Sequence, residues 1–162
     1  MILDFITTIR KNHALEHATV SVLMRKLRPG ARLMGRSTAD GFYIYGDAPH
    51  EAVSEAAEEA LGRLKQGEGN LAVSPFCGTN LAVAAILAGL ASMLAMRGEK
   101  EANRLPNVLL ATLAAVVIAQ PIGRIAQKYL TTSADVADVD IAEVTSTRKG
   151  THTRHKIRTL RG

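Results

Sequence analysis

The chain has 162 residues, of which 47% are hydrophobic and 22% charged, so it is long enough for one folded domain and is not a disordered sequence. A single cysteine excludes a disulfide framework and a multi-cysteine zinc finger, and the 4% of aromatic residues argues against a nucleic-acid partner. The net charge is +5, yet residues 77–96 and 105–123 contain no charged side chain.

The first segment is predicted to be one long helix. Between residues 2 and 28, apolar side chains recur at steps of three and four, and Pro29-Gly30 ends the pattern. We expect Ile6, Ile9, Val20 and Leu23 of this face to be buried, together with three polar residues in its middle. The face consists of Ile2, Ile6, Ile9, His13, Glu16, His17, Val20, Leu23 and Leu27.

The three polar residues, His13, Glu16 and His17, form an H-x-x-E-H sequence. The two histidines lie one helical turn apart and Glu16 lies within about 100° of both, so two imidazoles could bind zinc beside a carboxylate. These five residues resemble the signature of inverzincin metallopeptidases, in which the glutamate is the general base. Glu16 is therefore the candidate catalytic residue only if the protein is a hydrolase. The alternative is a buried, hydrogen-bonded His–Glu–His cluster that joins the helix to a sheet.

A zinc site needs a third protein ligand, which the spacing alone does not identify. Cys77, at the start of the first uncharged run, and His155, near the C-terminus, are the first candidates. Zinc is the expected cofactor if the protein binds a metal. The remaining candidate ligands are His50, Glu51, Glu55 and His152.

The residues after the first helix predict a β-hairpin, a second helix and a short strand. Residues 31–37 and 42–46 flank an Asp40-Gly41 turn. Asp47 is expected to cap a helix that has Pro49 in its first turn. Residues 70–73 are then expected to form a short strand.

The two uncharged runs predict a hairpin of two apolar helices. Each helix would be about 30 Å long, which matches the hydrocarbon core of a bilayer. Because few other residues are present to cover them, we favour a transmembrane hairpin over one buried in a soluble core. Thr79 or Asn80 is expected to cap the first of these helices. Arg124 and Lys128 follow the second, so the positive-inside rule places both termini in the cytoplasm.

The C-terminal residues predict a second β-hairpin, formed by residues 136–147 and 151–160. Its last strand would carry Thr153, His155 and Ile157 on one face and three basic residues on the other. Residues 148–161 contain six basic and no acidic side chains. This segment could bind anionic lipid headgroups, or it could be an ordinary solvated strand face.

Together these elements predict an α+β fold with a small mixed sheet and two packing helices, interrupted by an apolar two-helix hairpin that we expect to be transmembrane. Residues 1–76 would form the N-terminal part of the α+β domain and residues 77–130 the transmembrane hairpin. Residues 131–162 would form a C-terminal β-hairpin that completes the domain.

Three sequence signatures, NHALEHAT from Asn12, GFYIYGD from Gly41 and CGTNL from Cys77, resemble a family of bacterial proteins known only as a domain of unknown function. The resemblance covers most of residues 10–125 and implies membrane helices, but no activity or ligand set. The sequence thus predicts a membrane-anchored bacterial protein with a metal-binding or buried His/Glu cluster, and the lipid bilayer as its partner. The alternative is a membrane-associated, zinc-dependent hydrolase of the inverzincin kind.

Overall fold

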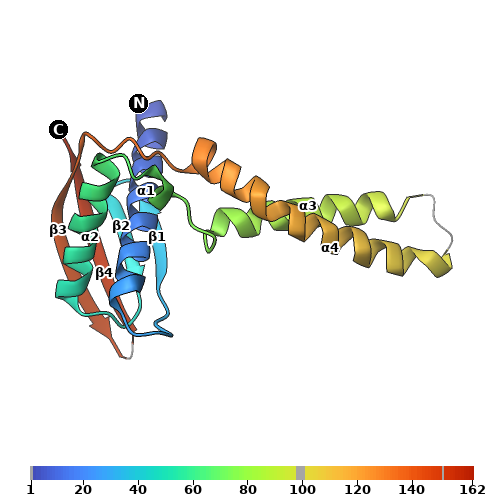
Figure 1. The fold of residues 1–162 in the computed structure, drawn as a ribbon, viewed down its shortest axis with the longest axis horizontal. Coiled ribbons are helices and arrows are strands. Elements are labelled where there is room, and N and C mark those ends of the chain that lie inside the picture. The colour runs from blue at the N-terminus through green and yellow to red at the C-terminus, as the bar shows by residue number, and fades with distance from the viewer. Residues whose placement is uncertain (1, 98–100, 151) are drawn as a thin grey trace. The chain divides into compact units, whose positions relative to one another are not determined.

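In a computed structural model, the chain folds into two compact units, each of which makes most of its contacts within itself. The first, the sheet unit, contains the residues up to Ser74 and those from Lys128 onward. The second, the hairpin unit, contains residues 75–127, so the chain leaves the sheet unit, forms the hairpin and returns (Figure 1). The described residues are 2–97, 101–150 and 152–162.

The sheet unit combines an antiparallel sheet with two helices. Its described strands have the order β1-β2-β4-β3, and every pairing between them is antiparallel. The predicted α+β fold is confirmed, but the sheet is antiparallel rather than mixed, because both of its hairpins join neighbouring strands by tight turns. In chain order, the elements are α1 (Ile2–Lys26), β1 (Met34–Thr38), β2 (Gly41–Tyr45), α2 (His50–Lys65), η1 (Gly69–Ala72), η2 (Gln127–Thr131), β3 (Val139–Lys149) and β4 (His152–Arg161).

The core lies between the sheet and the two helices, which contact one of its faces (Figure 1). Alternation along the strands sends Phe42 and Ile44 of β2 and Ile157 of β4 into this core. Because β4 pairs with both β2 and β3, the N-terminal and C-terminal parts of the chain complete a single sheet. The predicted alternation of the last strand is confirmed: His155 and Ile157 share one face, which is the buried one.

Helix α1 is buried mainly between Lys11 and Leu23. Leu15 and Leu23 are fully buried, but Ile2 and Ile6 expose 77% and 46% of their surface. The expected burial of Ile6 is therefore wrong. The reason is length: a 25-residue helix extends about 37 Å, roughly twice the length of the five-residue strands β1 and β2.

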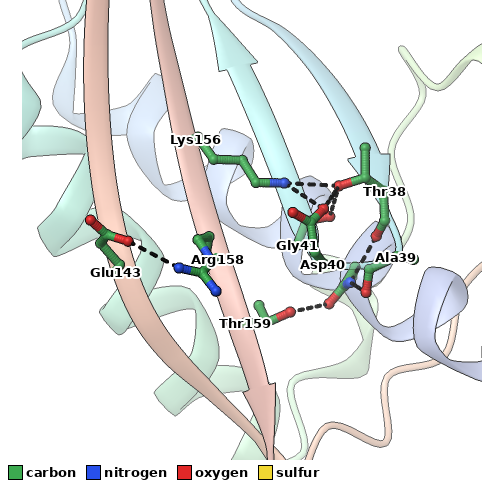
Figure 2. A network of polar contacts seen from close by, with 9 residues as sticks. Thr38, Ala39, Asp40, Gly41, Glu143, Lys156, Arg158 and Thr159 are labelled. Carbon is green, nitrogen blue, oxygen red and sulfur yellow. Dashed lines mark hydrogen bonds and ion pairs between the residues drawn. The ribbon is translucent and has the colours of Figure 1, made fainter.

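A polar network holds the Asp40-Gly41 turn against β4 (Figure 2). Lys156 donates from Nζ to Asp40 Oδ1 at 2.7 Å and to Thr38 Oγ1 at 3.0 Å, and Thr38 donates to the same carboxylate at 2.8 Å. The hydrogen bond from Lys156, followed by that from Thr38, lowers the pKa of Asp40. Gly41 has a φ of +132°, and a Cβ there would overlap the carbonyl of Ile157.

Two local predictions in this unit are wrong. Residues 69–72 form the short 3₁₀ helix η1 rather than a strand. Consecutive side chains of a strand point to opposite faces, whereas Leu71 and Ala72 are both buried. Helix α2 has Pro49 at its N-cap with no side-chain cap, so Asp47 does not cap it. The fixed φ of proline sets this helix start instead.

The hairpin unit consists of α3 (Gly78–Ala95) and α4 (Glu101–Ala126), which pack along one another. Both candidate spans are long and apolar enough to cross a membrane, and only 6% and 17% of their apolar windows are buried. Exposed apolar side chains such as Leu90 and Leu109 cover the helices. A soluble core helix would bury such residues, whereas a lipid-facing helix exposes them.

Polar groups of the hairpin unit bond to one another. Ser92 Oγ and Thr112 Oγ1 are 2.8 Å apart and join the two helices. At the base, Gln127 donates to Asn80 Oδ1 at 2.7 Å, and Asn80 donates to the carbonyl of Pro75 at 2.9 Å. The expected Thr79 or Asn80 cap is therefore wrong.

Cys77 is the N-cap of α3. Its Sγ accepts from the backbone N–H of Thr79 at 3.4 Å, the contact that a capping oxygen makes in other helices. Asn80 is thereby left for the contacts at the base of the hairpin. Gly123 of α4 lies so close to Asn80 that a Cβ would overlap the side-chain amide.

Candidate functional site

Helix α1 places His13 and His17 beside one another. Their ring centroids are 4.4 Å apart and their planes are inclined at 61°. The Nδ1 atom of His13 is 2.8 Å from the carbonyl oxygen of Thr131, and that of His17 is 2.8 Å from the carbonyl oxygen of Ala72. The one-turn spacing predicted that the two histidines share a face, and the structure confirms it.

These contacts determine which imidazole nitrogen carries the proton. A carbonyl oxygen can only accept, so Nδ1 of each ring must donate. In the neutral rings, the lone pair that a metal would use is then on Nε2 of both His13 and His17. Zinc-binding histidines are commonly oriented by this same bond from the non-ligating nitrogen to a carbonyl or carboxylate.

The two histidines bind the segments of the sheet unit that lead into and out of the hairpin. Ala72 precedes the hairpin and Thr131 follows it, and α1 holds the second of these segments further through Arg10. The guanidinium of Arg10 donates to the carbonyls of Tyr129 and Thr132 at 2.9 and 3.0 Å. Side chains of α1 therefore hydrogen-bond to both connecting segments.

Chain connectivity limits how far Cys77 can lie from the face of α1 that carries His13 and His17. It lies five residues after Ala72, whose carbonyl binds His17, so its backbone is tethered within about 18 Å of that contact even if the chain is fully extended. Two imidazoles and a thiol are donors that transition metals prefer. His13, His17 and Cys77 thus form a group that could hold a metal ion.

Glu16 lies on the β1 side of α1. It is 7% exposed, and its carboxylate lies against Gly35 of β1, at the place where a Cβ of residue 35 would be. A side chain larger than hydrogen at residue 35 would collide with it. The predicted interior position of Glu16 is confirmed, and the absence of a side chain at Gly35 is what makes room for it.

His155 belongs to a different network. Its Nδ1 is 2.7 Å from Ser146 Oγ, which in turn is 2.8 Å from Nδ1 of His50 on α2. Burial, followed by the charge of His50, lowers the pKa of His155. Glu51 and Glu55 are exposed on α2, and the side chain of His152 lies outside the described residues.

Asn12 is a site residue that the sequence analysis missed. Its amide donates to the carbonyls of Thr38 and Ala39 at 2.8 and 3.2 Å, and its oxygen accepts from Thr159 Oγ1 at 2.9 Å. The preceding residue, Lys11, forms an ion pair with Asp138 that lowers the pKa of this carboxyl group. The signals in the sequence were that these polar residues precede His13 and that Asn12 begins the NHALEHAT signature.

The two units define a class of protein, an antiparallel α+β domain into whose chain a hairpin of two apolar helices is inserted. Residues 8–144 match the family described as a domain of unknown function, DUF6391, and the chain belongs to this family. The resemblance to a bacterial family without an assigned activity is thereby confirmed.

The chain is also similar to an uncharacterized protein of the cyanobacterium Picosynechococcus sp. The two are 39% identical over 135 residues, which cover 77% of this chain and 66% of that protein. The chain therefore spans slightly less than two thirds of the length of this relative. No solved structure matches the chain.

Proposed function

We propose that the protein is a membrane-anchored metal-binding protein in which His13, His17 and Cys77 hold a zinc ion. The observation that carries the proposal is the shared orientation of the two imidazoles. Both donate from Nδ1 to backbone carbonyls, so both have the Nε2 lone pair for a metal. Zinc accepts two imidazoles and a thiolate, and three protein ligands would leave its fourth position for water or a small ligand.

The test is elemental analysis of the full-length protein purified in a mild detergent with zinc in the medium. We expect one zinc per chain, which His13→Ala, His17→Ala and Cys77→Ala each remove. His50→Ala is the matched control, because His50 lies on α2 and bonds Ser146. Wild-type protein without stoichiometric metal, or equal metal content in all four variants, contradicts the proposal.

Cobalt substitution tests the third ligand, for which Cys77 and His155 were the first candidates. A thiolate ligand gives Co²⁺ an intense charge-transfer absorption that imidazole ligands lack. We expect this band in the wild type and in His155→Gln, and we expect Cys77→Ser to lose it. A band that persists in Cys77→Ser would rule out the thiolate ligand, and cobalt binding lost only in His155→Gln would assign His155 instead.

The proposed anchor is the hairpin of residues 77–130, which would span the membrane twice. Its support is the exposure of its apolar side chains, together with the bonds that satisfy Ser92, Thr112, Asn80 and Gln127 within the hairpin. Cell fractionation tests it: the protein should remain in the membrane pellet after alkaline carbonate extraction. Recovery in the soluble fraction, monodisperse without detergent, would contradict it.

Anionic lipid headgroups are the further partner that we propose for the basic C-terminal strand. Arg154 of β4 is exposed, whereas Lys156 is paired with Asp40 and Arg158 with Glu143. Two of these three charges are already paired. The contribution of each basic residue to the free energy of membrane binding should therefore fall below the roughly 1 kcal/mol of an unpaired one.

A zinc-dependent hydrolase is the second candidate function. The open fourth position on the metal favours it, since catalytic zinc sites have three protein ligands and a water. The place of the Glu16 carboxylate over Gly35 makes it the weaker candidate, because a general base must reach the metal-bound water. Glu16→Gln should retain zinc in either case, and loss of a peptidase activity in this variant alone would favour the hydrolase.

A further inference from the structure

A cavity of about 910 Å³ lies in the sheet unit, bordered by the α1–β1 loop, the β2–α2 loop and the ends of β3 and β4. Neither His13 nor His17 of α1 borders it. Its volume falls within the range of about 300–1,000 Å³ that small-molecule sites occupy. The charged and titratable residues on its border are Arg28, Arg32, Asp47, His50, Arg148 and His155.

The border of the cavity is cationic. Arg28, Arg32 and Arg148 are exposed, and none of them forms an ion pair within the described part of the chain. Asp47 is the one acidic residue on the border. Helix α2 begins here at His50 without a side-chain cap, so its first amides and the positive end of its dipole also face an incoming anion.

A buried imidazole borders the same cavity with one nitrogen unsatisfied. His155 is fully buried, its Nδ1 bonds Ser146, and its Nε2 has no hydrogen-bond partner among the described residues. Burial, followed by the charge of His50, lowers the pKa of His155. The main chain of Gly46 and Ala48 lies near enough to the ring to raise this pKa to a smaller extent, but it does not meet the geometry of a hydrogen bond to Nε2. The ring is therefore neutral at neutral pH.

The proton on Ser146 links the two imidazoles. A serine hydroxyl has one proton, so Ser146 donates to one of the Nδ1 atoms and accepts from the other. When it donates to His155, the proton of that ring is on Nε2, where it is an orphaned buried donor. Such a group is costly unless a ligand accepts from it.

We propose that this cavity binds the phosphate group of a small molecule or lipid headgroup, held by Arg32, Arg148 and the first amides of α2, with His155 donating from Nε2. Guanidinium groups match the geometry of phosphate oxygens with paired N–H donors. A neutral imidazole adds a donor without adding charge. The site is independent of the metal-binding group on α1.

Titration of the full-length protein with inorganic phosphate tests the proposal, with the imidazole NMR signals as the readout. We expect a saturable shift of the His155 signal and an affinity that Arg32→Ala lowers about tenfold, the loss of one charge-assisted contact. Arg36→Ala is the matched control, because Arg36 is exposed on β1 and does not border the cavity. A shift that does not saturate, or equal effects of the two arginine variants, overturns the proposal.

A second arm distinguishes the two sources of phosphate. The protein is reconstituted in phosphatidylcholine vesicles with or without phosphatidic acid and then titrated with inorganic phosphate. A soluble ligand predicts the same phosphate affinity in both membranes. A lipid headgroup predicts that phosphatidic acid shifts the His155 signal beforehand and weakens the binding of added phosphate. No shift of His155 in either membrane overturns the site itself.

Discussion

The imidazoles of His13 and His17 lie edge to face, 4.4 Å between centroids, and each binds a different connecting segment of the hairpin. His13 bonds the carbonyl of Thr131 and His17 that of Ala72. The hydrogen bonds of the two histidines are therefore compatible with a metal site. The bonds from Nδ1 fix the connecting segments, and the Nε2 atoms are the ones that a metal would use.

The bond of His17 predicts a stability effect that needs no metal. In protein stripped with a chelator, His17→Ala should lower the free energy of unfolding by about 1–3 kcal/mol, because it leaves the carbonyl of Ala72 without its buried donor. Denaturant unfolding in detergent measures this difference. His50→Ala, at an exposed residue, should change stability by less than about 0.5 kcal/mol. Equal stability of the two variants would show that the bond contributes nothing.

Glu16 and Gly35 predict a coupled pair. Gly35→Ala should destabilise the protein by about 1–3 kcal/mol, because the new methyl group overlaps the Glu16 carboxylate, and this side chain is too buried to swing aside. Glu16→Ala removes the obstacle, so the cost of the double variant should be smaller than the sum of the two single costs. Additive costs in a double-mutant cycle would contradict the overlap.

Elements with a local signal were predictable from the sequence. The periodicity of α1, the Asp40-Gly41 turn and the two uncharged runs depend on neighbouring residues, and each is found. The partners of Asn12, His13 and His17 were not predictable, since all three bind backbone carbonyls. Every residue carries a carbonyl, so such a partner leaves no mark in a sequence.

The errors have the same physical origin. The capping role of Cys77 was missed because thiols are not among the preferred caps, and oxygen-bearing Thr79 and Asn80 follow directly. Asn80 is instead required by Gln127, which lies far away in the chain. The position of β4 between β2 and β3 likewise depends on contacts across the whole inserted hairpin.

The lowered pKa of His155 predicts a pH dependence of stability. The unfolded value is near 6.5 and the folded value lies below it, so between the two the unfolded chain binds a proton that the folded protein does not. The contribution of His155 to the free energy of unfolding is complete above about pH 6.5 and is lost as the pH falls through the folded pKa. Denaturant unfolding from pH 8 downward should show a shallower loss of stability in His155→Gln than in the wild type. Identical slopes would mean that the pKa is unchanged by folding.

The last prediction concerns topology. Strand β4 pairs with β2, which lies on the other side of the hairpin in the chain, so both flanking parts must fold in one compartment. Residues 1–74 and 128–162 can share that compartment only if the hairpin crosses the membrane twice or not at all. Arg124 and Lys128 then favour the cytoplasm for both termini.

Reporter fusions measure this orientation. A fusion after Gly162 should be active as a cytoplasmic reporter, and one inserted at Gly98, outside the described residues, should be active only as an external reporter. Replacing Arg124 and Lys128 with glutamine should produce mixed orientations, since the charge bias is then lost. Arg158→Gln, far from the spans in the amino-acid sequence, should not. The reverse pattern of the two fusions would refute the orientation but retain the double crossing. A cytoplasmic signal from both sites would instead mean that the hairpin does not cross, and the membrane anchor would fall with it.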